Sequence, residues 1–290
     1  MSQTVYISDL DGTLLNSEGR VSDNSARIIS RLCRHGVRFT VATARTVATV
    51  RPLLTHIDLG KNPEPWILMT GAMTYNASTD CASFLGMNAS MCRRLDEAFA
   101  RFRFNPFVYM ANHGEPIHID VYHKEMMSKV ELAFYRQRKS LMLKTFHFSN
   151  HPERYYIADT DRLPDFNTDA AAPLLYLGMG EPEPVFLLAD HIRAIGGFYV
   201  SAYIDTYDTN VAYIEVFGDW VSKAKAINSL YEGCRKVVFG DNLNDIEMMH
   251  AADVAVAVGN ANPRVKEVAD IIIGTNDTDA VARFIFNENA

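Results

Sequence analysis

Short apolar runs alternate with amphipathic stretches at both ends of the chain. Residues 4–8 form a β-branched and aromatic run, which predicts a buried strand, and residues 37–42 and 66–69 repeat this pattern. Between the first two runs, Ser22 or Asp23 can cap a helix whose apolar residues recur on one face. The remaining predictions are helices at 46–56, 221–231, 244–250, 265–269 and 278–286, and strands at 236–239, 254–258 and 270–273. Strands that alternate with helices predict βαβ units and a parallel sheet, which is an α/β fold.

The middle of the chain has a different pattern of apolar and polar residues. It contains long helical patterns, alternating stretches typical of half-exposed strands, and prolines such as Pro173, Pro182 and Pro184 that indicate loops. The helical patterns cover 89–102, 124–139 and 183–195, and the alternating stretches cover 107–110, 117–122 and 198–204. We therefore expect a second α/β domain at 80–210, inserted into a first domain made of 1–79 and 211–290.

Composition excludes several classes of protein. The 290 residues include 48% apolar side chains and a formal charge of 28 − 35 = −7, which argues against broad binding to nucleic acid or to an acidic membrane. No apolar stretch is long enough to span a bilayer, and the first residues do not resemble a secretory leader. The four cysteines are scattered without zinc-like spacing, so we expect reduced thiols and a cytoplasmic location.

The strongest chemical feature is the segment Asp9-Leu10-Asp11-Gly12-Thr13, directly after the first predicted strand. Residues two apart at a strand end point to the same side, so Asp9 and Asp11 can face one ligand. Two such carboxylates repel each other unless a cation lies between them, and Mg²⁺ favours oxygen ligands. A surface turn of the Asp-x-Asp-Gly type is the alternative explanation.

Three further segments offer candidate groups, and the first two of them follow predicted strands. Asp241, Asn244 and Asp245 follow a strand and open a helix, where backbone N–H groups favour anions. Thr43 ends the second strand and Lys223 begins a helix. Each segment also has a plain structural explanation, which is a helix cap for the acidic segment and the threonine, and a solvated face for the lysine.

Taken together, these segments resemble the signature motifs of the haloacid dehalogenase superfamily in residue type and in order. They are Asp9-Leu10-Asp11, Thr43, Lys223 and Gly240-Asp241-Asn242-Leu243-Asn244-Asp245. The chain is most similar to the Cof-type branch, which carries a large α/β (C2-type) cap between its second and third motifs, where residues 80–210 lie here. The resemblance implies a Rossmann-like catalytic core with an inserted cap that sets substrate specificity.

Three positions depart from the pattern of that branch. Ala44 and Ala224 stand where the branch usually has glycine, and Thr70 stands where it usually has asparagine. None of these changes removes a chemical group from the phosphate site, but Thr70 removes an amide at its edge.

The resemblance also implies a mechanism. Asp9 would attack phosphorus, and Asp11 would protonate the leaving oxygen and later activate water. Mg²⁺ would be held by Asp9, the Asp11 carbonyl and Asp241, with Asp245 as ligand or support. The phosphoryl oxygens would be contacted by Thr43, Lys223 and Asn244. These roles predict a phosphatase that acts on a small phosphorylated metabolite such as a sugar phosphate.

Two other functions use the same residues. A phosphomutase of sugar phosphates would share the whole site, and a non-catalytic sensor of a phosphorylated ligand would need only part of it. In the middle domain, polar and aromatic residues are candidates for substrate contacts, although the same residues suit any half-exposed strand. These candidates are Tyr109, His113, His118, Asp120 and Tyr122.

Overall fold

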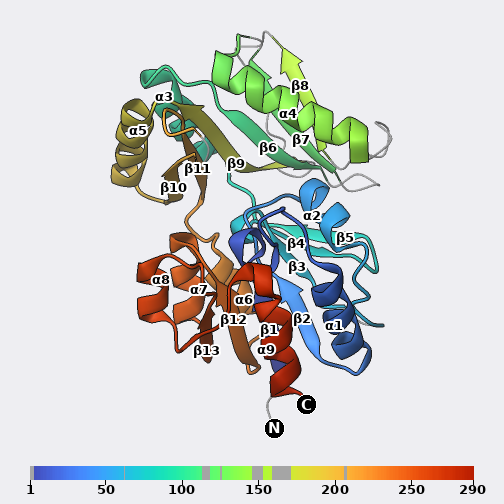
Figure 1. Ribbon diagram of the computed structural model, residues 1–290. Coiled ribbons are helices and arrows are strands. Elements are labelled where there is room, and N and C mark those ends of the chain that lie inside the picture. Colours follow the sequence, from blue (N-terminus) through green and yellow to red (C-terminus); the bar gives the residue numbers. More distant parts are fainter. Residues whose placement is uncertain are drawn as a thin grey trace. The chain divides into compact units, whose positions relative to one another are not determined.

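The computed structural model divides the chain into two compact units, Met1–Ser83 with Ser222–Ala290, and Phe84–Val221 (Figure 1). The structure describes residues 3–61, 63–112, 118–124, 126–145, 153–158, 171–205 and 208–290. Each unit has its own sheet and its own covering helices. The arrangement agrees with an inserted α/β domain, and the following paragraphs describe each unit by itself.

The first unit is built on a five-stranded sheet in the order β14-β13-β12-β1-β2. Its strands are β1 (Thr4–Ser8), β2 (Arg38–Val41), β12 (Arg235–Gly240), β13 (Val254–Ala257) and β14 (Ile271–Ile272). Every pairing between neighbours is parallel, which confirms the predicted α/β class with a parallel central sheet. The central strand β1 is almost wholly buried, because apolar side chains occupy both of its faces.

Helices follow the strands of this sheet. They are α1 (Asp23–Arg34), α2 (Val47–Leu54), α6 (Lys223–Leu230), α7 (Ile246–His250), α8 (Pro263–Val268) and α9 (Ala280–Glu288). The Ser22 hydroxyl accepts a hydrogen bond from the Ser25 N–H, so the predicted cap of the first helix is present. Helix α1 packs against α9, and α6 packs against α7 (Figure 1).

The third predicted strand begins a smaller sheet. Strand β3 (Trp66–Leu68) pairs antiparallel with β4 (Met73–Asn76), which is followed by β5 (Cys81–Phe84). A parallel bridge between Ala42 and Ile67 joins this sheet to the end of β2. The turn between β3 and β4 is thereby brought to the carboxyl edge of the main sheet.

Asp279 ties the two ends of the first unit together. Its carboxylate accepts hydrogen bonds from the Ser22 hydroxyl, from Asn24 Nδ2 at 2.8 Å and from Ser25 Oγ at 2.9 Å. Burial acts to raise the pKa of Asp279, but these hydrogen bonds outweigh it and hold the pKa below its usual range. The carboxylate therefore stabilises the fold above its unfolded pKa of about 4, and this contribution is lost as the pH falls through the lower folded pKa.

We expect Asp279→Ala to lower the free energy of unfolding by about 1–3 kcal/mol at pH 7, the range for losing a charged hydrogen-bond partner. The difference from the wild type should shrink towards pH 3, where the wild-type carboxylate begins to be protonated. Urea unfolding at both pH values measures it. An equal difference at pH 7 and pH 3 would show that the ionised carboxylate is not the stabilising group.

The second unit contains a six-stranded sheet in the order β10-β11-β9-β6-β7-β8. The strands are β6 (Phe107–Asn112), β7 (His118–Lys124), β8 (Glu153–Ala158), β9 (Ala171–Gly180), β10 (Phe198–Ile204) and β11 (Ala212–Gly218). The helices are α3 (Ala89–Arg101), α4 (Lys129–Thr145) and α5 (Pro182–Ile195). Buried residues of α3 and α5 form one apolar core with inward-facing residues of β6, β9 and β11.

The second boundary between the units lies later than expected from the sequence. We expected the chain to return to the first domain at residue 211, but the second unit extends to Val221. The cause is strand β11, which pairs antiparallel with β10 along its whole length and also with β9. The last strand of an inserted sheet looks the same in sequence as the first strand of the next domain, although β11 lies between β10 and β9 in the second unit.

Three prolines expected in loops lie within regular elements. Pro182 and Pro184 are in the first turn of α5, where a missing N–H costs nothing. Pro173 lies inside β9, opposite Met110 at a point where the pairing register shifts. Such an irregularity is where a strand tolerates a residue that donates no ladder hydrogen bond.

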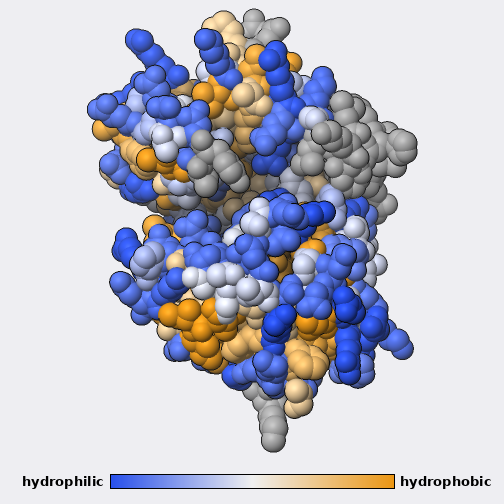
Figure 2. Space-filling model, in the orientation of Figure 1, coloured by the Kyte–Doolittle hydropathy of each residue, from blue (hydrophilic) through white to orange (hydrophobic). Residues whose placement is uncertain are grey.

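One face of the molecule can be described by the hydropathy of its residues. Figure 2 shows a mainly hydrophilic face with apolar side chains exposed in between. Among the helices that the structure describes, none is both long enough and apolar enough to cross a membrane.

Candidate active site

The carboxyl ends of three neighbouring strands place the predicted residues together. Ser8, the last residue of β1, pairs with Phe239 of β12 on one side and with Val41 of β2 on the other. The residues that follow these strands, Asp9, Asp241 and Thr43, therefore share one edge of the sheet. The predicted convergence of the separate motifs on one edge follows from this strand order.

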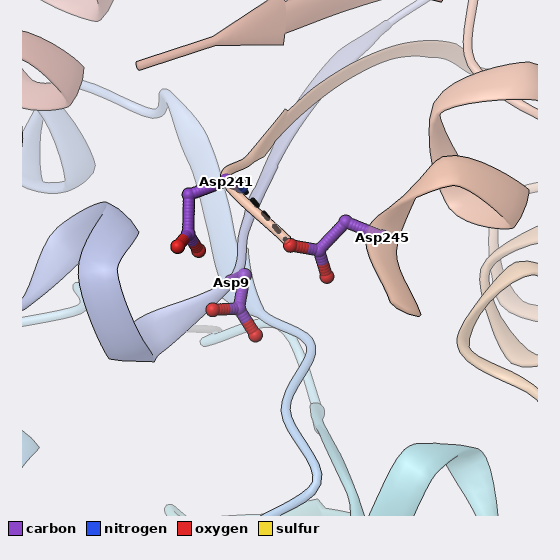
Figure 3. A group of neighbouring side chains, drawn as sticks. All are labelled: Asp9, Asp241 and Asp245. Atoms are coloured by element: carbon purple, nitrogen blue, oxygen red, sulfur yellow. Dashed lines mark hydrogen bonds between the residues drawn. The ribbon is translucent and has the colours of Figure 1, made fainter. Parts of the chain in front are cut away.

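Three carboxylates form a compact acidic cluster at this edge (Figure 3). Asp9, Asp241 and Asp245 each offer an oxygen, and these atoms lie within 4.8 Å of one another. Asp245 is completely buried and Asp9 is 6% exposed. Burial raises the pKa of Asp9 to about 8 and that of Asp241 to about 6, against the opposing effects of Lys223 and Thr13. The cluster carries more negative charge than its surroundings neutralise.

Lys223 is the buried cation of the cluster. Its Nζ lies 2.6 Å from Asp9 Oδ1 and 2.8 Å from Asp245 Oδ1, and its side chain is 2% exposed. Burial alone would lower the pKa of Lys223, but the two carboxylates outweigh it and raise the pKa above its usual value. Lys223 is the first residue of α6, and its predecessor Ser222 caps that helix. One ammonium against three carboxylates leaves an excess of two negative charges when all four groups are ionised.

Asp245 holds the cluster in shape. Its Oδ2 accepts the backbone N–H groups of Asp241 at 3.0 Å and Asn242 at 3.1 Å, while its Oδ1 faces Lys223. Both oxygens of Asp245 therefore already have partners within the protein. The predicted helix cap is also present here, because Asn242 and Asp245 form a capping box. The structural explanation of this segment is therefore confirmed, and its chemical role stays a prediction.

Asp9 and Asp241 are better placed to bind a metal ion. Asp241 Oδ1 accepts a hydrogen bond from Thr13 Oγ1 at 2.8 Å. Among the described residues, no hydrogen bond reaches Asp9 Oδ2 or Asp241 Oδ2. Two free carboxylate oxygens in a cluster with excess negative charge are the donors that a hard divalent cation such as Mg²⁺ prefers. The residues present therefore fit the expected metal.

Gly12 allows the segment Asp9-Leu10-Asp11 to approach Asp241 closely. Its φ is +74°, and a Cβ at this position would lie 2.9 Å from Asp241 Cγ. A residue with a side chain would therefore be strained in its backbone and would also displace the Asp241 carboxylate. The Asp-x-Asp-Gly turn is part of the site and not an isolated surface turn.

The side chain of Asp11 lies apart from the acidic cluster. Its two oxygens accept hydrogen bonds from Arg45, from Nε at 2.7 Å and from Nη2 at 2.5 Å. The Asp11 side chain is 57% exposed. Sequence reasoning did not assign Arg45 to the site, although Arg45 lies two residues after Thr43 in a segment that matches the superfamily pattern.

The two other predicted phosphate-binding residues differ in exposure. Thr43 is 1% exposed, and its hydroxyl accepts the backbone N–H of Arg45 at 3.2 Å. Asn244 is exposed in the short helix Leu243–Asp245. Thr70, the departure noted at the edge of the site, adopts a φ of +60°. Asparagine accepts this left-handed conformation far more readily than a β-branched residue does, which gives a backbone reason for the usual residue there.

The candidate substrate contacts in the middle domain are mostly interior residues. Tyr109, His118 and Asp120 are buried in β6 and β7, while Tyr122 is half-buried. His113 lies outside the described residues. Tyr122 also packs against the apolar core of the second unit, so a role in substrate contact stays a prediction for all of them.

The chain is similar to proteins of one known family. The family of haloacid dehalogenase-like hydrolases matches residues 6–285. Pyridoxal phosphate phosphatase of Escherichia coli is 55% identical over 51 residues, which are 18% of this chain and 19% of that protein. The 5-amino-6-(5-phospho-D-ribitylamino)uracil phosphatase of Bacillus subtilis is 23% identical over 96% of this chain and 94% of its own length.

A solved structure shows the same fold. A haloacid dehalogenase-like hydrolase from Bacteroides thetaiotaomicron superimposes with a TM-score of 0.70 over 100% of both chains. The sequence identity to it is 20%. This likeness confirms the architecture of the core and of the inserted domain as a fold.

Proposed function

Because the chain belongs to the haloacid dehalogenase-like hydrolase family, we propose that it is a magnesium-dependent phosphatase acting on a small phosphorylated metabolite. The observation that carries this proposal is the buried Asp9 carboxylate, which contacts Lys223 and lies beside two further carboxylates. A buried carboxylate at a strand end, with one free oxygen, suits a nucleophile. The excess negative charge around it suits a metal-dependent one.

The chain's own residues supply both steps of the reaction. An oxygen of Asp9 attacks phosphorus while the bond from phosphorus to the leaving oxygen breaks, and Asp11 gives that oxygen a proton. In the second step a water attacks the aspartyl-phosphate, Asp11 takes the proton of the water, and phosphate leaves with the Asp9 carboxylate restored. Lys223, Thr43 and Asn244 contact phosphoryl oxygens and stabilise the charge that develops on them.

Magnesium would be held by the Asp9 and Asp241 carboxylates and by the Asp11 carbonyl. Asp245 supports this set through Lys223 and through the backbone of Asp241. When bound, the ion offsets the repulsion between an anionic nucleophile and an anionic phosphate. Asp245 contributes by fixing its neighbours, because both of its oxygens are already occupied.

The names of two relatives suggest where to look for the substrate. One relative is named for pyridoxal phosphate and the other for a phosphorylated ribityl compound, both small phosphate esters. Phosphate release should therefore be measured over a panel that contains both compounds and common sugar phosphates. Release from at least one compound supports the proposal, and isomerisation without release would favour a sugar phosphomutase. Tight binding of a phosphorylated compound without either reaction would favour a sensor.

Removing the metal should remove the activity. We expect chelation to abolish phosphate release and added Mg²⁺ to restore it. Saturating Mg²⁺ should also stabilise the fold, by about 2.7 kcal/mol at a hundred times the Kd. In Asp241→Asn, one of the two free carboxylate oxygens is lost, so most of this stabilisation should disappear.

Thermal unfolding with and without Mg²⁺ measures the effect independently of turnover. The exposed Glu232 provides the matched control, and Glu232→Gln should keep the full shift in Tm. A shift of equal size in Asp241→Asn and in the wild type would contradict the assignment of the metal site.

A further inference from the structure

Arg45 forms a bidentate ion pair with Asp11. Nε and Nη2 of the guanidinium each donate to a different oxygen of the Asp11 carboxylate. Two parallel hydrogen bonds fix the plane of a carboxylate as well as its position, which a single contact does not do. Because Asp11 is 57% exposed, packing does not restrain its side chain, and Arg45 supplies the restraint.

The backbone of Arg45 is itself held at both ends. Its N–H donates to Thr43 Oγ1 at 3.2 Å, and its carbonyl accepts the N–H of Met69 at 3.0 Å. The next N–H, that of Thr70, donates to the carbonyl of Thr43 at 3.0 Å. The turn Met69–Gly71 thus fixes the segment that carries both Thr43 and Arg45.

This turn is a strained piece of backbone. Met69, Thr70 and Gly71 have φ values of +49°, +60° and +99°, so two residues with side chains adopt left-handed conformations in succession. Each such residue costs on the order of 1–3 kcal/mol, and a β-branched one belongs at the upper end. An exposed ion pair contributes only about 0–1 kcal/mol to stability. The free-energy cost of the strained backbone therefore exceeds the stabilisation that the Arg45–Asp11 ion pair provides. A role other than stability must account for this arrangement.

We infer that Arg45 is a positioning residue, which orients Asp11 towards the leaving oxygen while the turn Met69–Gly71 holds Arg45 in place. This inference rests on the proposed function, because it assigns a part in the same proton transfer. A proton donor acts only within about 2.6–3.2 Å of its acceptor, so an exposed carboxylate that rotates freely would seldom be correctly placed. Arg45 makes this placement independent of burial.

The test compares two leaving groups. Nitrophenolate departs from p-nitrophenyl phosphate with little need of a proton, whereas the alkoxide of a sugar phosphate needs one. Arg45→Lys keeps the positive charge but loses the paired hydrogen bonds to the two Asp11 oxygens. We expect it to lower kcat/KM about 10- to 100-fold for the sugar phosphate that the wild type hydrolyses best. For p-nitrophenyl phosphate the change should stay below about 3-fold, because this constant covers only the steps up to departure of the leaving group.

The chain offers a closely matched control in Arg51. Arg51 pairs with Asp80, and the two side chains are 33% and 59% exposed, against 32% and 57% for Arg45 and Asp11. Arg51→Lys should leave both substrates unaffected. The Arg45→Lys, Asp11→Asn double variant should be no slower on the sugar phosphate than Asp11→Asn alone, because Arg45 acts through Asp11.

Other outcomes separate the alternatives. An equal loss on both substrates with a raised KM would show that Arg45 binds the phosphate, and no loss on either would reduce the pair to a surface contact; both results would overturn the inference. Failure of the proposed function would give a different result, because the metal-loaded wild type itself would release phosphate from neither compound. The inference about Arg45 would then be overturned as well.

Discussion

Asp9→Asn is expected to lower kcat by at least about 10⁴-fold on every substrate of the wild type, the scale seen when an enzyme loses its nucleophile. The amide has nearly the same shape as the carboxylate, but it does not form an aspartyl-phosphate. Phosphate release under saturating Mg²⁺ measures the loss. Acid-quenched protein should carry covalent phosphate in the wild type and none in the variant.

The same substitution should leave the fold intact in the absence of metal. Asp9 is buried beside two other carboxylates, and its pKa is raised to about 8 because burial opposes its charge. Removing that charge lowers the repulsion in the cluster, while Lys223 keeps its contact with Asp245. We therefore expect the Tm of metal-free Asp9→Asn to equal or exceed that of the wild type.

The pair of measurements distinguishes a nucleophile from a structural aspartate. Loss of activity together with a lowered Tm would mean that Asp9 chiefly supports the fold. Full activity in Asp9→Asn would exclude the aspartyl-phosphate route altogether. An active-site residue that costs stability and supplies chemistry gives opposite signs in the two experiments.

The sequence predicted which residues meet at this edge where position along a strand decides the outcome. Asp9, Thr43 and Asp241 each follow a short apolar strand, and parallel strands bring their carboxyl ends to one edge whatever the loops do. Asp245 lies four residues after Asp241 and follows from the same strand end. Lys223 opens α6 after β11, a strand of the other sheet, so strand order did not predict its contact with Asp245.

Contacts that depend on loop conformation did not follow from the sequence. Thr13 donates to Asp241 across 228 residues, and Arg45 reaches Asp11 only because two separate loops adopt particular backbone angles. The boundary at residue 210 failed for a related reason, since the partner strands of Ala212–Gly218 are not visible in its own pattern. Periodicity indicates which face of an element is buried but not which distant element covers it.

Lys223→Met is expected to have the largest effect on stability. Lys223 is 2% exposed and its ammonium contacts both Asp9 and Asp245, so its loss leaves two buried carboxylates without a cation. Removing one partner of a buried ion pair costs about 3–5 kcal/mol. In the proposed mechanism Lys223 contacts phosphoryl oxygens, so its loss should also lower kcat about 10²- to 10³-fold.

The effect of pH and of a second substitution identifies the cause. Protonation of the unpaired carboxylates removes the repulsion, so the stability deficit of metal-free Lys223→Met should be smaller at pH 5 than at pH 8. The Asp9→Asn, Lys223→Met double variant should be more stable than Lys223→Met alone, because one of the two uncompensated charges is gone.

Lys225, exposed on the same helix, is the control, and Lys225→Met should change the free energy of unfolding by less than about 0.5 kcal/mol. A stability deficit that is equal at both pH values, and that Asp9→Asn does not relieve, would contradict this explanation. Lys223 would then stabilise the fold by packing its aliphatic chain and not by neutralising the acidic cluster.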